Sequence, residues 1–219
     1  MAVDTRCDLR AVFGDARHQG TRPTCIAFAL SDAHSAARGI IEPMSAEHLY
    51  YHAIQRSPGR HPSDGVGLAQ ACEALHLDGQ SMENIWPYLA TLPNEVAKWV
   101  PPPGTHPLFR RETQVVTSAL TDVIAQLNLG NPVILILLLG KRFYEPVNGL
   151  VTAGPDDTDT AYHAVIAVGH GHSNGGDICI LIRNSWGSGW ALKGYSWVTA
   201  SYLQVRLKHV VSMKAVSTQ

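Results

Sequence analysis

Cys25 is the residue whose type and place in this sequence point most directly to chemistry. It follows Pro23 and Thr24 and opens a segment that we predict to be a helix ending at about Arg38. A helix N-terminus carries about half a positive charge, which favours a thiolate over a thiol. Because the thiolate is the nucleophilic form, Cys25 is a candidate for covalent catalysis. The structural alternative is a small buried side chain on the apolar side of the helix.

A nucleophilic cysteine needs a base, and the base needs a group that orients it. His163 begins the apolar segment HAVIAV and is a candidate base, while Asn184 could hold its imidazole in one tautomer. Trp186 could shield that hydrogen bond from water. Gln19, six residues before Cys25, could donate its amide to a developing oxyanion beside the Cys25 backbone N–H. The plain alternatives are a core histidine, a turn asparagine, a core tryptophan and a polar loop residue.

The elements that must position these residues change in kind along the chain. Capping and spacing signals predict helices in the first half and strands in the second. The predicted helices are Cys25 to about Arg38 with Thr24 as cap, Ala46–Arg56 with Ser45 as cap, a stripe of Leu68, Ala71, Cys72 and Leu75 ending at Gly79, and a stripe from Val116 to Leu127 ending at Gly130. The predicted strands are Pro132–Leu139, Ala161–Val168, Ile178–Arg183 and Tyr195–Thr199, with a turn at Asn148–Gly149, a hairpin loop at His172–Asp177 and a Pro-rich linker from about Trp86 to Pro107. Helices first and strands later predict an α+β fold with two lobes meeting at a cleft.

Composition excludes several classes of protein. Of the 219 residues, 45 % are hydrophobic and 16 % charged, a balance that a disordered chain would reverse. A formal charge of -1 gives no basic surplus for nucleic acid. The longest strongly apolar run, Val133 to Leu139, is too short to span a bilayer. We therefore expect neither a nucleic-acid nor a membrane partner.

The cysteines and histidines do not indicate a metal site. No C-x-x-C pair is present and no secretory signal is visible, so we expect thiols in a reducing, cytoplasmic compartment. Delivery as a secreted effector by a signal-independent route is the alternative. The one histidine cluster, His170 and His172, is predicted to lie in a turn. No metal and no cofactor is expected. The four cysteines are Cys7, Cys25, Cys72 and Cys179.

Three segments together resemble the papain-like cysteine peptidases. They are QGTRPTCIAFA around Cys25, YHAVIAVGHG around His163 and RNSWGSGWALKGYSWV around Asn184, of which the last is the most specific. SAEHLYYHA and GNPVILILLLGKRFYEPVNGLV extend the resemblance to most of the chain. It implies a single papain-like domain over residues 1–219, with a helical lobe at roughly 20–110, a β-rich lobe at roughly 111–215, and the active site in the cleft between them.

The resemblance implies a cysteine-type peptidase. Cys25 would attack a peptide carbonyl and form a thioester, with His163 as acid and base, Asn184 as orienter and Gln19 in the oxyanion hole. The expected partner is a peptide or protein substrate, with an inhibitory or regulatory protein or domain as a second. By the same resemblance, the substrate-binding residues are Gly65, Val66 and Ala164.

The sequence departs from the family pattern at several places. Arg22 stands where the family's signature has a cysteine, and Ser63 begins the segment that usually supplies its disulfide partner. Both partners are absent together, which fits reducing conditions. Val66 replaces the second glycine of a substrate-binding pair, so side-chain preference is left open. About 18 residues precede Gln19, too few for the family's folded pro-region, so we expect either a domain of a longer chain or another form of control.

Two other functions stay open at this point. A deamidase, a transglutaminase-like enzyme or an isopeptidase can use the same Cys-His-Asn chemistry. An inactive, peptidase-like binding module is the second alternative. The presence of Gln19, Cys25, His163 and Asn184 together argues against an inactive copy, because such a copy could lose any of them.

Overall fold

The computed structural model describes residues 3–155 and 157–214. These residues form helices and a large, mostly antiparallel sheet, which confirms the predicted α+β class. They fall into two compact units. The β-rich unit comprises the described residues of Met1–His18 and Gln114–Ser212, and the helical unit those of Gln19–Thr113 and Met213–Gln219. The N-terminal segment, for which the sequence predicted no element, thus belongs to the β-rich unit.

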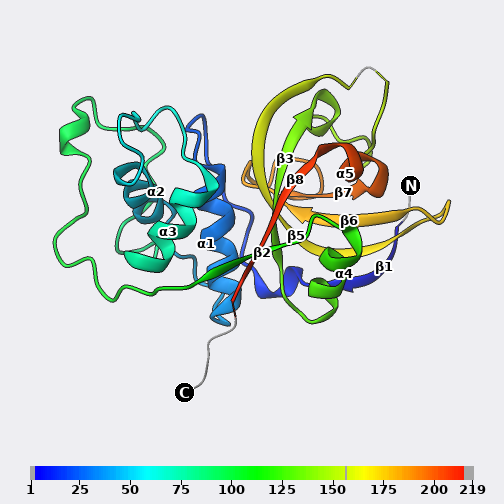
Figure 1. Ribbon diagram of the computed structural model, residues 1–219, viewed down its shortest axis with the longest axis horizontal. Coiled ribbons are helices and arrows are strands. Elements are labelled where there is room, and N and C mark those ends of the chain that lie inside the picture. Colours follow the sequence, from blue (N-terminus) through cyan, green and yellow to red (C-terminus); the bar gives the residue numbers. More distant parts are fainter. Residues whose placement is uncertain (1–2, 156, 215–219) are drawn as a thin grey trace. The chain divides into compact units, whose positions relative to one another are not determined.

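The helical unit contains three packed α-helices (Figure 1). Ten consecutive residues of the first helix, from Ile26 to Ser35, are buried, so it is surrounded on all sides as an apolar helix must be. Ser45 caps the second helix as predicted, because its Oγ accepts from the backbone N–H of His48 at 3.0 Å. The helices are α1 (Cys25–Ala37), α2 (Ala46–Gln55) and α3 (Leu68–Leu77), followed by a 3₁₀ turn, η2 (Val96–Lys98).

Two details of these helices differ from the sequence prediction. Thr24 occupies the N-cap position of α1, but its side chain makes no capping hydrogen bond; its hydroxyl lies 2.8 Å from that of Tyr88 instead. In α3 the buried face is made by Ala71, Ala74 and Leu75, whereas Leu68 and Cys72 of the predicted stripe are only partly buried. Both differences arise from tertiary contacts. A capping residue and an apolar stripe express only local preferences, which such contacts can override.

The β-rich unit is built on one sheet whose strand order is β2-β8-β3-β5-β6-β7-β4, with β1 also pairing with β5. All the registered strand pairs are antiparallel except β4 with β7. The strands are β1 (Val3–Asp8), β2 (Thr113–Val116), β3 (Val133–Gly140), β4 (Leu150–Val151), β5 (Asp159–Ser173), β6 (Ile178–Arg183), β7 (Tyr195–Thr199) and β8 (Leu207–Met213). The helical elements are α4 (Leu120–Asn128), α5 (Ala200–Arg206) and the 3₁₀ turns η1 (Arg10–Val12) and η3 (Lys141–Phe143).

The core of this unit follows from the period of two that a strand imposes on its side chains. Val133, Leu135, Leu137 and Leu139 are alternate residues of β3, and all four are buried in one cluster. α4 and α5 contribute to the same cluster through Val123, Leu127, Tyr202 and Leu203. The apolar run that was too short for a membrane therefore forms a central strand, as predicted.

Three sequence predictions in this unit need correction. Val116 was predicted to begin a helix, but it ends strand β2, and α4 begins only at Leu120. The pair His170 and His172 lies in strand β5 rather than in a turn, because β5 continues to Ser173. The hairpin loop is correspondingly shorter than predicted. The turn at Asn148–Gly149 is confirmed, with positive φ angles of 52° and 73°.

A backbone contact explains two glycines of β5. Strand β1 pairs with Gly169 and Gly171, and an added Cβ at Gly171 would lie 2.4 Å from the carbonyl oxygen of Asp4. Only glycine allows β1 to approach this closely. No helix among the described residues has the length and apolar composition needed to cross a membrane.

Candidate active site

The sheet register positions His163 and Asn184. His163 lies on β5 opposite Leu137 of β3, and β5 pairs on its other edge with β6, where Ile166 faces Arg183. Asn184 directly follows β6, so this antiparallel hairpin brings it one diagonal step from His163. His163 Nε2 lies 2.7 Å from Asn184 Oδ1. The predicted base and its predicted orienter are therefore in contact.

The hydrogen bonds around Asn184 determine which nitrogen of His163 carries the proton. The backbone N–H of Ser185 donates to Asn184 Oδ1 at 2.8 Å, which fixes this atom as the carbonyl oxygen. Since a carbonyl oxygen only accepts, His163 Nε2–H must be the donor to it. The other ring nitrogen, Nδ1, is then the one available for proton exchange with a reactant.

Aromatic side chains cover the imidazole of His163. The ring of Trp186 lies 4.8 Å from it at 36°, where the β5–β6 register continued by three residues would place it. Phe143 contacts the same imidazole at 5.9 Å. Tyr144 stacks on Trp186 at 5.3 Å. Trp186 was predicted to limit the access of water to the His163–Asn184 bond, and its contact with the ring is consistent with that role.

Burial controls the charge of His163. The side chain is 5 % exposed, and burial lowers its pKa to about 4, while the hydrogen bond to Asn184 acts in the opposite direction. By itself, this imidazole is neutral at pH 7. An imidazolium at this position requires a negative charge nearby.

The segment that carries Asn184 is tied to the N-terminal part of the chain. The backbone N–H of Gly187 donates to Arg17 O at 2.9 Å, and His18 forms a β-bridge with Trp186. Gly187 has a φ of 75°, and a Cβ there would lie 2.8 Å from the imidazole of His18. This contact gives a physical reason for the glycine in the segment NSWG.

Cys25 is the first residue of α1, as predicted, and is partly buried. Its backbone N–H is one of the helix-initial donors that the helix does not use itself. Gln19, predicted as the oxyanion donor, is 7 % exposed, and its Nε2 donates to the backbone carbonyl of Arg22 at 2.8 Å. Gln19 and Cys25 belong to the helical unit, whereas His163 and Asn184 belong to the β-rich unit.

The predicted substrate-binding residues lie in two places. Gly65 is in the loop before α3, with a φ of 76°, and an added Cβ there would lie 3.5 Å from Pro23. Val66 follows it and is partly buried. Ala164, next to His163 on β5, is 2 % exposed and pairs with Ile136. Substrate binding by these three residues stays a prediction.

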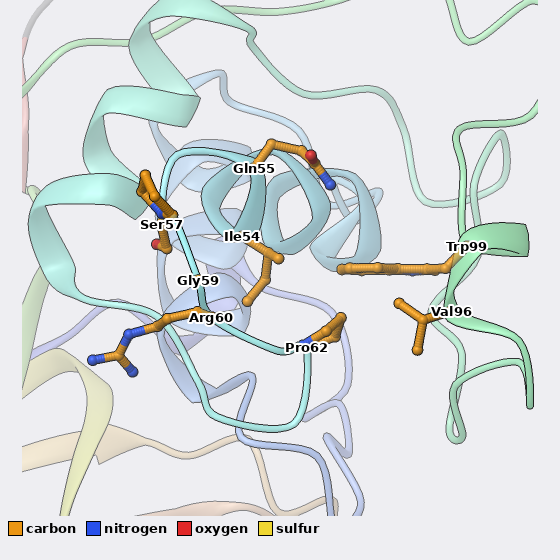
Figure 2. A pocket seen from close by; sticks show the side chains of 9 residues that line it. Ile54, Gln55, Ser57, Gly59, Arg60, Pro62, Val96 and Trp99 are labelled. Atoms are coloured by element: carbon orange, nitrogen blue, oxygen red, sulfur yellow. The ribbon is translucent and has the colours of Figure 1, made fainter.

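A separate pocket of about 260 Å³ lies in the helical unit. Figure 2 shows Trp99 extending toward Ile54, with Pro62 and Val96 nearby and the guanidinium of Arg60 directed away from the tryptophan. Its lining includes neither Gln19 nor Cys25. The pocket is lined by Ile54, Gln55, Ser57, Pro58, Gly59, Arg60, Pro62, Val96 and Trp99.

The other three cysteines are Cys7, Cys72 and Cys179. Burial raises the pKa of the Cys7, Cys72 and Cys179 thiols, which makes them poor nucleophiles near neutral pH. None of the four cysteines, all within the described residues, forms a disulfide. Over residues 3–155 and 157–214, no group of three or more histidine, cysteine or acidic side chains could hold a metal ion.

Two residues near Gln19 and Thr24, Tyr88 and Glu47, were not predicted from the sequence. The hydroxyl of Tyr88 donates to the backbone carbonyl of Gln19 at 2.7 Å and also lies 2.8 Å from Thr24 Oγ1. Glu47 accepts from the guanidinium of Arg22 at 2.7 Å. Tyr88 lies in the Pro-rich linker and Glu47 on α2, both distant in sequence from Gln19. The only sequence signal was the unexpected arginine at position 22, whose charge would require an acidic partner if it were buried.

Comparison with known proteins places this arrangement in a family. The model described as "Papain family cysteine protease" matches residues 3–215, nearly the whole chain. The protein therefore belongs to the papain family of cysteine proteases, which confirms the resemblance found in the sequence.

Individual relatives agree with this membership. A cysteine protease of Blomia tropicalis is 26 % identical over 208 residues, which cover 90 % of this chain and 60 % of that protein. The chain thus spans less than two thirds of that relative's length. Xylellain, a cysteine protease from Xylella fastidiosa, superimposes with a TM-score of 0.79 at 22 % identity, covering 98 % of this chain and 87 % of that one. A Carica candamarcensis cysteine protease, CMS1MS2, solved in complex with E-64, gives a TM-score of 0.72 at 21 % identity, covering 94 % of this chain and 96 % of that one. These likenesses establish the papain-like α+β fold.

Proposed function

We propose that this protein hydrolyses peptide bonds in peptide or protein substrates, with Cys25 as the nucleophile and His163 as its acid–base partner. Family membership supports the reaction class. The observation that carries the assignment is the 2.7 Å hydrogen bond between His163 Nε2 and Asn184 Oδ1, because it leaves Nδ1 for proton transfer. Cys25, at the start of α1, supplies the nucleophile at a helix N-terminus.

The first half of the reaction forms a thioester. The Cys25 thiolate attacks the peptide carbonyl carbon, a C–S bond forms, and the carbonyl oxygen becomes an oxyanion. A Gln19 Nε2–H and the Cys25 backbone N–H donate to this oxyanion. When the intermediate collapses, the C–N bond breaks and the proton on His163 Nδ1 passes to the leaving amine.

The second half releases the acid. Water attacks the thioester carbonyl while neutral His163 takes its proton at Nδ1. Collapse breaks the C–S bond and restores the thiolate and the imidazolium. The reaction needs no oxidant and no reactant other than the peptide and water.

The charge state of His163 fits this scheme. Burial lowers its pKa to about 4, so its imidazolium needs a neighbouring anion, and the Cys25 thiolate is the anion that the reaction requires. The two groups are therefore expected to become charged together rather than separately.

Covalent labelling tests the proposal directly. A peptidyl epoxide of broad papain-family reactivity is incubated with the protein, and the modified peptide is mapped by mass spectrometry. We expect Cys25 alone to be labelled at pH 6, because burial disfavours the thiolates of Cys7, Cys72 and Cys179. Cys25→Ala should abolish both labelling and cleavage of a fluorogenic peptide while keeping α1, since alanine is a good helix former. Equal labelling of all four cysteines would contradict the assignment.

The same preparation separates peptide hydrolysis from related acyl transfer. Cleavage of a peptide library is compared with release of ammonia from glutamine side chains and with cleavage of an isopeptide bond. We expect peptide cleavage to dominate. Ammonia release without backbone cleavage would identify a deamidase, and binding without either reaction would identify an inactive module.

We further propose that the protein works in a reducing compartment. The thiol state of Cys7, Cys72 and Cys179 and the occupation of position 22 by an ion-paired arginine support this proposal. Alkylation in denaturant without reductant, followed by intact mass, should find four modified thiols in protein isolated from its source. Two or fewer would contradict the reducing compartment.

A further inference from the structure

A buried ion pair lies close to the start of α1 in the sequence. It joins Arg22, which precedes Cys25, to Glu47 of α2. The guanidinium of Arg22 donates through Nη1 to Glu47 Oε2 at 2.7 Å and to the backbone carbonyl of Leu89 at 2.6 Å. The side chain of Arg22 is 6 % exposed and that of Glu47 is fully buried. A charge pair this deep in a protein is held by hydrogen bonds on both members, because burial of an uncompensated charge is strongly unfavourable.

Glu47 is satisfied on both of its oxygens. The indole Nε1–H of Trp99 donates to Oε1 at 2.6 Å, and the backbone N–H of Leu89 donates to Oε2 at 3.0 Å. The rings of Tyr88, Tyr50 and Trp99 lie 5.0, 5.4 and 5.8 Å from the guanidinium carbon of Arg22. The ion pair and its hydrogen bonds therefore connect α2, the linker after α3 and the segment before Cys25.

The Arg22–Glu47 ion pair is connected to Gln19 through the backbone carbonyl of Arg22. The backbone carbonyl of Arg22 accepts from Gln19 Nε2 at 2.8 Å and from the backbone N–H of Thr24 at 2.8 Å. A carbonyl only accepts, so this bond also decides that the nitrogen of the Gln19 amide faces Arg22. A primary amide nitrogen carries two N–H donors, and this bond uses one of them to set the orientation of the amide.

We propose that Arg22 and Glu47 are positioning residues for the oxyanion donor Gln19: the ion pair fixes the Arg22 carbonyl, which in turn orients the Gln19 amide. This inference rests on the proposed function, because it assigns its effect to the oxyanion that the cleavage reaction develops. The ion pair does not touch substrate. It acts through one backbone carbonyl and one side-chain amide.

The proposal predicts a specific split between two reactions of Cys25. Peptide cleavage develops an oxyanion and needs an oriented Gln19 donor, whereas alkylation by iodoacetamide develops none. Loosening the ion pair should therefore lower kcat and leave both KM and the rate of Cys25 alkylation nearly unchanged. A general loss of folded structure would lower cleavage and alter alkylation together.

The test is a double-mutant cycle with Gln19. Arg22→Met keeps a long unbranched side chain but removes the charge and its donors, and Glu47→Gln keeps the shape of its residue. Gln19→Ala alone should lower kcat by about 10²–10³-fold. Arg22→Met or Glu47→Gln alone should lower kcat by between about tenfold and hundredfold, the range expected for a displaced catalytic group. In the Gln19→Ala background, each should lower kcat by less than about threefold, because the group they position is already gone.

A matched control is available in the other unit. Arg206 forms a similarly buried ion pair with Asp157 and a second ion pair with the exposed Asp159, and no described contact links it to Gln19. Arg206→Met should lower the thermal midpoint without changing the ratio of kcat to alkylation rate. If Arg22→Met leaves Glu47 as a lone buried charge and does not fold, the double change Arg22→Met with Glu47→Leu removes both charges and enters the same cycle.

The outcomes separate this inference from the proposed function. Equal fold-losses from Arg22→Met, or from the double change, in the presence and absence of Gln19 would overturn the positioning role while peptide cleavage stands. A parallel fall of alkylation and kcat would also overturn it, by pointing to a purely structural role. A wild-type chain that cleaves no peptide and keeps Cys25 unlabelled would overturn both proposals at once.

Discussion

The two units hold their candidate functional residues by different means. In the β-rich unit, His163 lies in a strand that is hydrogen-bonded to β3, and the β5–β6 hairpin brings Asn184 beside it. In the helical unit, Gln19 precedes the first helix, and its position depends on side chains that reach it from elsewhere in the unit. These are the hydroxyl of Tyr88 and the ion pair of Arg22 with Glu47.

The two units should therefore be sensitive to substitution at different kinds of residue. A position set by a β-ladder depends on backbone hydrogen bonds, which no single side-chain change removes. A position set by a polar network depends on every member, because one missing partner leaves another buried and unpaired. We therefore expect loss of function in the β-rich unit only from His163 and from Asn184, which bonds it, and in the helical unit also from residues such as Glu47 that contact no catalytic side chain.

The largest predicted effect belongs to the β-rich unit and concerns His163 and Asn184. His163→Ala removes the thiolate's partner and the proton donor, a role generally worth about 10²–10⁴-fold in rate. Asn184→Ala frees the ring but leaves nucleophile and base in place, so its loss should be smaller. Rates of peptide cleavage and of Cys25 alkylation measure both. Normal cleavage by His163→Ala would show that the base lies elsewhere.

The second prediction concerns stability in acid and the helical unit. Burial lowers the pKa of His34 and of His48 to about 4, below the ordinary value of 6.5. Between pH 6.5 and pH 4 these histidines are protonated in the unfolded chain but remain neutral in the folded chain. The free energy of unfolding is therefore retained above pH 6.5 and falls as the pH drops toward 4. Each histidine should contribute a loss of about 3 kcal/mol over that range.

Urea unfolding of the Cys25→Ala protein, which cannot digest itself, measures this loss between pH 7 and pH 4.5. His34→Gln should reduce the pH dependence, because it removes one of the buried histidines whose pKa is lowered to about 4. His61→Gln is the matched control, since His61 is exposed. An unchanged pH dependence in His34→Gln would contradict the assignment to this residue.

A third prediction tests the backbone contact between β1 and β5. In Gly171→Ala the new Cβ would collide with the Asp4 carbonyl, so β1 must shift, at a cost of about 1–3 kcal/mol. Gly189→Ala is the control, because an added Cβ there meets no atom within 4 Å. Thermal unfolding compares the two. Equal stability of both variants would mean that β1 is not held as closely as described.

The smallest predicted effect compares one helix cap from each unit. Ser45 caps α2, and its hydroxyl also donates to the Trp86 carbonyl at 2.6 Å, whereas Thr199 caps α5 with a longer bond of 3.4 Å to the Tyr202 N–H. Ser45→Ala should cost about 1–2 kcal/mol and Thr199→Ala about 0.5–1 kcal/mol. Denaturant midpoints of the two variants decide the order, and a larger loss from Thr199→Ala would reverse it.

Much of the secondary structure could be predicted from local sequence signals. The first two helices, the turn at Asn148–Gly149 and strands β3, β6 and β7 could be predicted because capping residues and apolar periodicity report directly on local backbone preference. Strand β5 was predicted too short, because its later residues include glycines that pair with β1 and carry little strand signal of their own. Strands β1, β2, β4 and β8 and helix α5 were missed. Strands β1 and β8 alternate weakly and become strands only by pairing with β5 and β3.

Residue types and motifs were enough to predict the kind of site: Cys25 at a helix start, and His163, Asn184 and Trp186 in segments distinctive enough to indicate the family. How these residues are held became clear from their contacts in the folded protein. Nε2 of His163 bonds Asn184, and the ion pair of Arg22 and Glu47 anchors the carbonyl to which Gln19 binds. Distance along the chain explains the difference: local patterns report on neighbours within a few residues, whereas Arg22 and Glu47 are 25 residues apart and Glu47 and Trp99 are 52 apart. No spacing rule predicts such contacts, because they depend on how helices and linker pack together.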